Sequence, residues 1–308
     1  MADLSYLGLL AREFPNERKA LTEIVNLNAI LNLPKGTEYF LSDLHGEHEA
    51  FLHILKSASG VIRSKIDEIF SRSLTSAERD GLELLVYSAK EELARRKKTE
   101  KNFDEWCKIS IYRLIDICKS VSSKYTRSKV RKRMHPGSEY ILDELLNADD
   151  ETNRESYYEE IINTLLKFKV AEQFIEEVAQ TISRLAVERL HVIGDMFDRG
   201  PHPDLIIDHL ESFHDVDFQW GNHDAVWMGA AAGNWACIAG AIRVNIGYDN
   251  FDMLEIGYGI NLRPLYAFAT EVYRDDPCER FKPHLLDKNE YDQVDPKLTA
   301  KMHKAITI

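Results

Sequence analysis

The feature that most constrains the fold is a set of three short, β-prone runs that each end in polar residues and glycine. The runs are 37–46 (TEYFLSDLHG), 189–195 (RLHVIGD) and 215–224 (DVDFQWGNHD). Each is short and apolar enough to be a strand that stops at its polar end. Because segments 47–58 and 203–213, which follow the first two runs, have helical spacing, the sequence predicts the βαβ units of a parallel sheet.

The long segment between the first two runs has a different character. Residues 61–186 carry apolar side chains at steps of three and four among many charges, with scarcely a strand candidate. We therefore expect an α/β protein whose β-sheet core, residues 1–60 and 187–308, is interrupted by an all-helical insertion at 61–186. A further helix is expected at 15–33, and the chain after 224 should be mainly helices and loops.

Composition limits the partners and the location of the protein. The formal net charge is −12, and such an acidic chain repels nucleic acid and anionic membrane surfaces, so neither is expected as a partner. No uncharged apolar stretch of about 18 residues predicts a membrane span, and the first residues meet charge too early for a signal peptide. The four cysteines lack CxxC spacing and are expected to be reduced thiols of a cytoplasmic protein.

The polar ends of the three runs carry residues that suit a metal site. Functional groups gather at the carboxyl ends of parallel strands, so these ends should meet in one crevice if the strands are neighbours. Carboxylate, imidazole and amide groups together suit Mn, Fe or Zn better than Ca. We expect metal ligands at Asp43, His45, Asp195 and Asn222, with Asp195 bridging two ions about 3.5–4 Å apart.

Three further residues beside these predicted ligands are candidate catalytic groups for hydrolysis of a phosphate ester. His223 could protonate the leaving alkoxide, and Asp198 could orient that imidazole or the attacking water. Arg199 could hold phosphate oxygens through its planar guanidinium group. A structural ion pair between Arg199 and a neighbouring aspartate is the competing interpretation of that residue.

The three motifs in this order, SDxHG, GDxxDRG and GNHD, resemble the signature of the calcineurin-like metallophosphoesterases. The 24 residues from Asp198 to Asn222 are usual for that superfamily, whereas the 152 from Asp43 to Asp195 greatly exceed its usual step. A helical insertion at this place, preceded by SDLHGEHEAFLHILKSASGVI and containing YTRSKVRKR, is similar to the class III fructose-1,6-bisphosphatases of bacteria. The resemblance covers essentially the whole chain.

The resemblance implies a phosphatase that removes the 1-phosphate of fructose 1,6-bisphosphate in gluconeogenesis, usually with manganese. It implies that Asp43, His45 and Asp195 bind a first metal ion and that Asp195 and Asn222 bind a second. The sugar bisphosphate would be the small-molecule partner, and a homo-oligomer remains open. The positions that match the family's proton-donor pair and its phosphate-contacting arginine are His223, Asp198 and Arg199.

The resemblance also implies that the chain is an N-terminal portion with an incomplete sheet core. The superfamily completes its second metal site with two later histidines, whereas only His284 and His303 follow Asp224, and neither follows a β-run with a glycine turn. Family members are much longer than this chain, and the apolar end AITI suggests an interrupted strand. The remaining ligands are therefore expected after Ile308.

Several alternatives stay open. Protein serine/threonine phosphatases and dinucleoside polyphosphate hydrolases share the motifs but lack an insertion of this size, and a fragment without turnover is the non-enzymatic alternative. The basic run 124–133 (KYTRSKVRKR) could bind the substrate's second phosphate, a regulatory nucleotide or another anion, or be a solvated helix face offset by acids. The small residues at 228–241 favour close helix packing.

Overall fold

The structure, a computed structural model, describes residues 4–57, 60–147, 155–284 and 295–308. The chain divides into two compact units, which we call the helical unit (1–37 with 60–186) and the sheet unit (38–59 with 187–308). The division expected from the sequence placed 1–60 with the sheet and 61–186 alone. This expected division into domains remains a prediction. Residues 1–3, 58–59, 148–154 and 285–294, which it also covers, lie outside the described residues.

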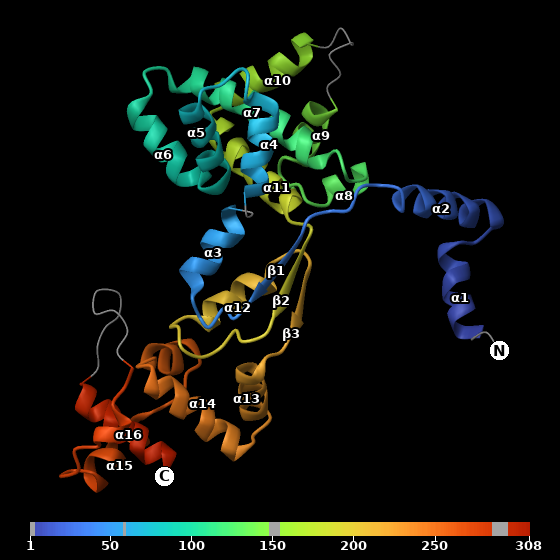
Figure 1. Cartoon of the computed structure of the whole chain (residues 1–308). Helices are drawn as coiled ribbons and strands as arrows, with labels where there is room; N and C mark the ends of the chain where they lie inside the picture. Colours follow the sequence, from blue (N-terminus) through green and yellow to red (C-terminus); the bar gives the residue numbers. More distant parts are fainter. Residues whose placement is uncertain (1–3, 58–59, 148–154, 285–294) are drawn as a thin grey trace. The chain divides into compact units, whose positions relative to one another are not determined.

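The described part of the helical unit contains helices and no strand (Figure 1). This confirms the helical interpretation of 61–186 wherever the structure describes it. The helix expected at 15–33 is also present, with somewhat narrower bounds. The elements are α1(Leu4–Glu13), α2(Glu17–Ile30), α4(Val61–Phe70), α5(Ser76–Tyr87), α6(Ala89–Thr99), α7(Phe103–Ser122), α8(Arg127–Arg131), α9(Glu139–Leu146), α10(Glu155–Lys167) and α11(Ala171–Ala186).

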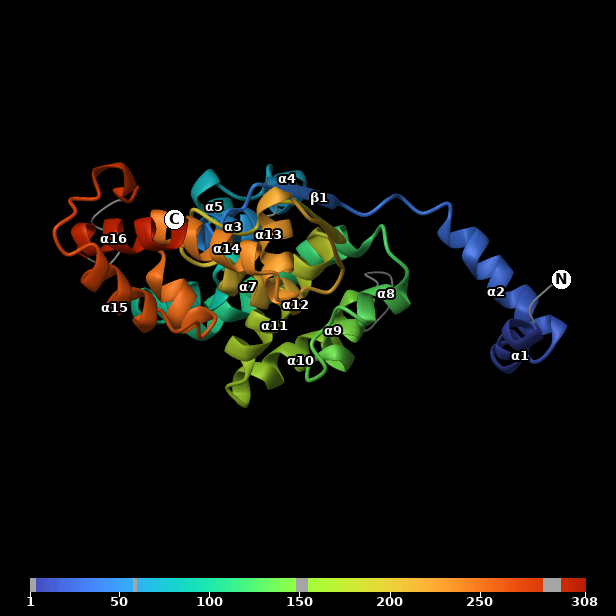
Figure 2. The same ribbon diagram turned by 90° about the horizontal axis from the view of Figure 1, so that it is seen from below.

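Helices α7 and α11 form the centre of the helical unit, where they pack against each other (Figures 1 and 2). Apolar residues recur along α11 at helical spacing, so one stripe of the helix is buried, including Phe174, Val178, Ile182 and Leu185. Helices α1 and α2, in contrast, bury none of their residues.

Two adjacent residues after α7 hold both chain segments that lead into the sheet. The Lys124 Nζ donates a hydrogen bond to the Thr37 hydroxyl at 2.9 Å. The Tyr125 hydroxyl donates to the Leu185 carbonyl at 2.8 Å. Thr37 directly precedes the first strand, and Leu185 lies four residues before the second strand begins at Arg189.

The sheet unit contains a three-stranded parallel sheet in the order β1-β2-β3. Its strands are β1(Glu38–Ser42), β2(Arg189–Ile193) and β3(Val216–Gln219), in register with Glu38 opposite Arg189 and Leu190 opposite Val216. Helix α3(His48–Ser57) follows β1 and contacts α12(Pro203–Glu211), which follows β2. The expected β–α units are therefore confirmed, and all three polar strand ends lie at one edge of the sheet.

In the residues that the structure describes after β3, the sheet unit consists of helices and loops, as the sequence predicts. It comprises α13(Asn222–Ala231), α14(Trp235–Gly247), the π-helix η2(Met253–Gly257), α15(Arg263–Val272), the 3₁₀ helix η3(Glu279–Phe281) and α16(Pro296–Thr307). Helices α14, α15 and α16 lie together in Figure 2 and share a buried apolar cluster. The expected close packing of small residues is confirmed, because a Cβ on Gly229 would lie 2.5 Å from the Cys237 Sγ.

One expectation about this region is wrong. The apolar end AITI, interpreted as an interrupted strand, instead forms the end of α16, with Ile308 as the residue that caps it. Helix α16 begins with Pro296 after Asp295, whose carboxylate accepts a hydrogen bond from the Lys297 N–H and so caps the helix. Met302 and Ile306 lie four residues apart on the face that packs into the apolar cluster. Helical spacing over the whole segment thus outweighs the β-prone character of its last residues.

Two further expectations concern the chain as a whole. None of the helices in the described ranges is long and apolar enough to cross a membrane. All the cysteines are free, as expected, and burial raises the thiol pKa of both Cys107 and Cys118 to about 12.

Candidate functional site

The ends of β1 and β2 stay paired beyond the strands themselves. The Asp43 N–H donates to the Gly194 carbonyl at 3.2 Å, and the His45 N–H donates to the Asp195 carbonyl at 2.9 Å. These bonds hold the loop after β1 beside the loop after β2. The predicted ligands of the two strands are therefore brought together by backbone pairing.

Asp43, His45 and Asp195 form a group that could hold a metal ion, with ligand atoms all within 4.8 Å of one another. The Nε2 of His45 lies 3.9 Å from the Asp43 Oδ1. The Nδ1 of His45 lies 3.1 Å from the Phe197 carbonyl, which can only accept, so Nδ1 carries the proton. Nε2 is then the free nitrogen, and its orientation is fixed in the way that metal-binding histidines are usually held.

The backbone at these loops adopts a conformation that side chains rarely tolerate. Of the eight non-glycine residues in the described chain with φ values between 45° and 74°, five lie in these two loops, namely Asp43, His45, Asp195, Asp198 and Arg199. Such left-handed residues are uncommon and cost free energy, and they cluster at functional sites. Each of the five is a residue that the sequence predicts to bind metal or to act in catalysis.

Close backbone contacts explain the glycines of these motifs. A Cβ on Gly46, which has a φ of +72°, would lie 2.6 Å from the Gly200 carbonyl oxygen. A Cβ on Gly200 would in turn overlap the His45 carbonyl oxygen. The absence of side chains at Gly46 and Gly200 therefore lets the loops after β1 and β2 touch.

Asn222, the predicted ligand from the third strand, is the first residue of α13. Its neighbours on both sides contact the Asp195 carboxylate. The His223 N–H donates to the Asp195 Oδ1 at 3.1 Å, and a Cβ on Gly221 would overlap that same oxygen. The backbone of the GNHD motif thus lies directly against Asp195, which places Asn222 beside the group of candidate ligands.

The predicted acid–base residues form a direct pair. The His223 Nδ1 lies 2.7 Å from the Asp198 Oδ2, and the Asp198 side chain is 1% exposed. The His223 ring also lies edge-to-face with His45, with 5.3 Å between centroids. Since the Asp198 carboxylate accepts the Nδ1 proton, the His223 Nε2 is available for a substrate. Arg199 is exposed beside this pair.

Sequence reasoning missed the structural role of Asp224, the last residue of the GNHD motif. Its buried carboxylate accepts hydrogen bonds from the backbone N–H groups of Asp195 at 2.7 Å, Met196 at 2.9 Å and Gly221 at 2.8 Å. It thereby joins the end of β2 to the turn before α13. An acidic residue three positions into a helix is a capping signal that could have indicated this role.

The basic run 124–133 is partly neutralised within the helical unit. Arg127 pairs with Asp143 at 2.7 Å, and Arg131 pairs with Glu139 at 2.8 Å. For these two arginines the structure confirms the interpretation that the positive charge of the helix face is neutralised by nearby acidic residues.

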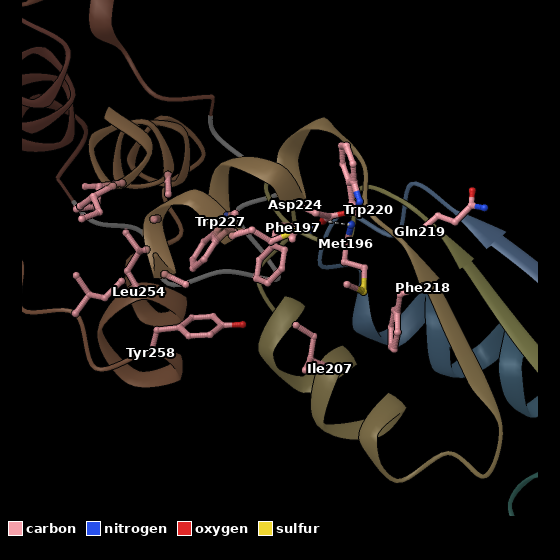
Figure 3. Close-up of a pocket in the computed structure, with 17 residues that line it drawn as sticks. Met196, Phe197, Ile207, Phe218, Gln219, Trp220, Asp224, Trp227, Leu254 and Tyr258 are labelled. Atoms are coloured by element: carbon pink, nitrogen blue, oxygen red, sulfur yellow. Dashed lines mark hydrogen bonds between the residues drawn. The ribbon is translucent and has the colours of Figure 1, made fainter. Parts of the chain in front are cut away.

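An apolar cavity of about 780 Å³ is lined in part by Met196 and Phe197 of the loop after β2 (Figure 3). Its wall includes the aromatic rings of Phe197, Trp227 and Tyr258, and Phe197 stacks on Trp227 with 4.5 Å between centroids. Burial raises the pKa of the Tyr258 hydroxyl to about 12, so it stays protonated at neutral pH. Because this wall is apolar, the cavity is not the place where a charged phosphate would bind.

Comparison with known proteins finds similarity to fructose-1,6-bisphosphatases. The family model described as Firmicute fructose-1,6-bisphosphatase matches residues 5–308. The chain is 52% identical over 307 residues to the fructose-1,6-bisphosphatase class 3 of Clostridium botulinum strain Hall, which covers 99% of this chain and 46% of that protein. A class 3 enzyme of Clostridium beijerinckii is 51% identical over 307 residues, covering 99% of this chain and 47% of the relative. The chain thus spans about half the length of these relatives, and no solved structure matches it.

Proposed function

Because the chain belongs to the Firmicute fructose-1,6-bisphosphatase family, we propose that it carries metal-binding and proton-donating groups of such an active site. The proposed reaction of the whole protein is hydrolysis of the 1-phosphate of fructose 1,6-bisphosphate to fructose 6-phosphate and phosphate, in gluconeogenesis. The observation that supports it most is the group formed by Asp43, His45 and Asp195, with ligand atoms within 4.8 Å of one another.

We propose two divalent ions, manganese in particular, as the cofactors. Asp43, His45 and Asp195 would hold one ion, and Asp195 and Asn222 would hold the other. The oxygen and imidazole donors fit such ions, and the free Nε2 of His45 faces the Asp43 carboxylate. When bound, the ions would supply Lewis-acid charge for a phosphate ester and its attacking water.

Hydrogen bonds and exposure support the roles that we propose for the remaining residues. His223, protonated on both ring nitrogens, would donate its Nε2 proton to the O1 of the departing sugar while its Nδ1–H stays bonded to Asp198 at 2.7 Å. Asp198 would stabilise this imidazolium cation and fix the orientation of the ring. Arg199, exposed on the same turn, would bind phosphate oxygens in a bidentate manner.

We further propose that β1, β2 and β3 are part of a metallophosphoesterase-type sheet core. A cytoplasmic location is proposed as well, because all the cysteines are free thiols, which suits a reducing compartment.

Phosphate release from fructose 1,6-bisphosphate with added manganese tests the proposed function, in a chain extended to the length of the relatives. Release of one phosphate with fructose 6-phosphate as product supports it, and no release removes it. Preferential hydrolysis of a phosphopeptide or a dinucleoside polyphosphate would favour another phosphatase of the superfamily. Metal analysis of the 308-residue chain tests the alternative that this chain is a fragment without catalytic turnover. Two tightly bound ions per chain would contradict that alternative.

A further inference from the structure

The carboxylate of Asp198 is held from three sides. Its Oδ2 accepts the His223 Nδ1 proton at 2.7 Å. Its other oxygen, Oδ1, accepts hydrogen bonds from the Trp227 Nε1 at 3.1 Å and from the Asn245 Nδ2 at 3.0 Å. The two donors come from α13 and α14, and neither belongs to a motif that suggests catalysis. They leave Oδ2 as the oxygen that faces the imidazole.

Trp227 is itself fixed by aromatic contacts. It lies on α13 four residues after His223, so both side chains project from the same face of the helix. Its indole stacks on Phe197 with 4.5 Å between centroids and is tilted against Tyr258 at 5.0 Å (Figure 3). The indole therefore has little freedom to turn its N–H away from Asp198.

Asn245 is buried completely and uses both of its amide protons. Its Nδ2 donates to the Ala241 carbonyl at 2.9 Å, one turn earlier in α14, as well as to Asp198. The nearby Asn250, 5% exposed, donates to the carbonyls of Arg199 at 3.1 Å and Gly200 at 3.2 Å. The turn that carries Asp198 is thus fixed both at its side chain and at its backbone.

We propose that Trp227 and Asn245 are positioning residues that hold the Asp198 carboxylate in the orientation that aligns His223 for proton donation. This inference rests on the function proposed above. A carboxylate with one oxygen bound by two fixed donors can rotate only by breaking both bonds, so the other oxygen stays aimed at the imidazole. Loss of either donor leaves the group buried but less constrained, and the imidazole then samples orientations that do not reach the leaving oxygen.

The dependence of rate on the leaving group tests this role. Trp227→Phe keeps an aromatic ring at this position and removes the N–H together with part of the indole, and Asn245→Leu keeps a similar shape without the amide. We expect kcat for fructose 1,6-bisphosphate to fall about tenfold in each variant of the full-length enzyme, with KM and bound manganese unchanged. Hydrolysis of p-nitrophenyl phosphate, whose leaving group needs little protonation, should change by less than about twofold.

The matched control is Trp235→Phe, a tryptophan on α14 that is 85% exposed, and it should alter neither rate. An equal loss of rate on both substrates would show a general structural effect and overturn the proposal. Unchanged rates on both substrates in both variants would overturn it as well.

A measurement without turnover separates this proposal from the proposed function. In the 308-residue chain with ¹⁵N-labelled tryptophan, Asp198→Asn should shift the Trp227 indole resonance and speed its exchange with water. The indole of Trp106, in the helical unit, should stay in place. An unmoved Trp227 resonance would refute the contact. A full-length enzyme that hydrolyses neither substrate would remove the proposed function, while the indole result still decides whether Trp227 holds Asp198.

Discussion

The carboxylate of Asp224 accepts a hydrogen bond from the backbone N–H of Asp195, with 2.7 Å between Oδ2 and N. Through this bond the residue that ends the third motif fixes the backbone of the candidate bridging ligand in the second. The same carboxylate also accepts from Met196 and Gly221, so one buried side chain determines how the ends of β2 and β3 meet.

Asp224→Asn should therefore weaken both folding and metal binding. The amide NH₂ replaces one acceptor oxygen, and each backbone N–H left without a partner costs about 1–3 kcal/mol. Urea unfolding and titration calorimetry with Mn²⁺ on the 308-residue chain measure the two effects. Asp252→Asn, an exposed residue that makes no side-chain cap at the start of η2, is the control and should behave as the parent. Parent-like stability in Asp224→Asn would contradict the role given to this carboxylate.

Asp195→Asn should remove both metal ions, because one carboxylate is proposed to serve both. The asparagine can still donate through its backbone to Asp224 and accept from the His223 N–H, so the fold should survive. Elemental analysis of the purified variant gives the number of ions per chain, with the exposed Asp208→Asn as control. Retention of either ion rules out bridging by Asp195.

His223→Ala should leave metal content largely intact and reduce turnover by about 10²–10⁴-fold, the usual contribution of a general acid. The imidazole contacts Asp198 and the ring of His45, whereas the candidate metal group is formed by Asp43, His45 and Asp195. Steady-state kinetics of the full-length enzyme with saturating manganese measure the effect. An unchanged rate would exclude His223 as the proton donor.

Gly200→Ala should destabilise the site because its Cβ would overlap the His45 carbonyl oxygen, a backbone atom that cannot move alone. We expect a loss of about 1–3 kcal/mol in the free energy of unfolding and weaker Mn²⁺ binding. Gly240→Ala in α14 is the matched control. Its Cβ would meet the nearest side chain at 3.5 Å, an ordinary contact, and alanine favours a helix interior by up to about 1 kcal/mol. The prediction fails if both variants are equally stable.

The Arg127–Asp143 pair predicts a pH-dependent contribution to stability in the helical unit. The Arg127 guanidinium lowers the pKa of Asp143 from its ordinary 3.8, while burial acts in the opposite direction. A carboxyl group with a lowered pKa stabilises the fold above pH 3.8, and this contribution is lost as the pH falls further. The difference in unfolding free energy between the parent and Asp143→Asn should thus be largest near neutral pH.

That difference should shrink as the pH falls below 3.8, which denaturant unfolding at several pH values measures. Glu68→Gln, which removes the exposed Lys65–Glu68 pair, should have little effect at any pH. A constant difference for Asp143→Asn across the whole range would argue against ionic stabilisation by Asp143.

The strands and the candidate ligands were predictable because their signals are local. An apolar run followed by Asp and Gly marks a strand end within a few residues, and parallel strands bring such ends to one edge. For this reason Asp43, His45 and Asp195 were identified from the sequence and are brought together by the fold. The bridging role of Asp195 and the second ion stay predictions.

The residues that support the site were not predictable, since their roles depend on tertiary contacts. Trp227 and Asn245 lie on either side of the segment 228–241, which is rich in small residues and whose pattern indicates helix packing and nothing about Asp198. An asparagine inside a helix usually suggests a local backbone bond, and the partner that matters for Asn245 lies 47 residues away. The end of the chain was mispredicted because a few β-prone residues were weighed above the spacing of the whole helix.

The contacts made by Lys124 and Tyr125 have a consequence for the order of assembly. Strands β1 and β2 must find each other across a long intervening chain, and closing so large a loop has a high entropic cost. Lys124 and Tyr125 tether the segments that enter the two strands, and these bonds lie wholly within the helical unit. We expect that, once the helical unit has folded, these two bonds hold the segments that enter β1 and β2 near each other, which lowers the entropic cost of pairing the strands. The helical segment that separates the candidate ligands in sequence would thus help to bring them together in the fold.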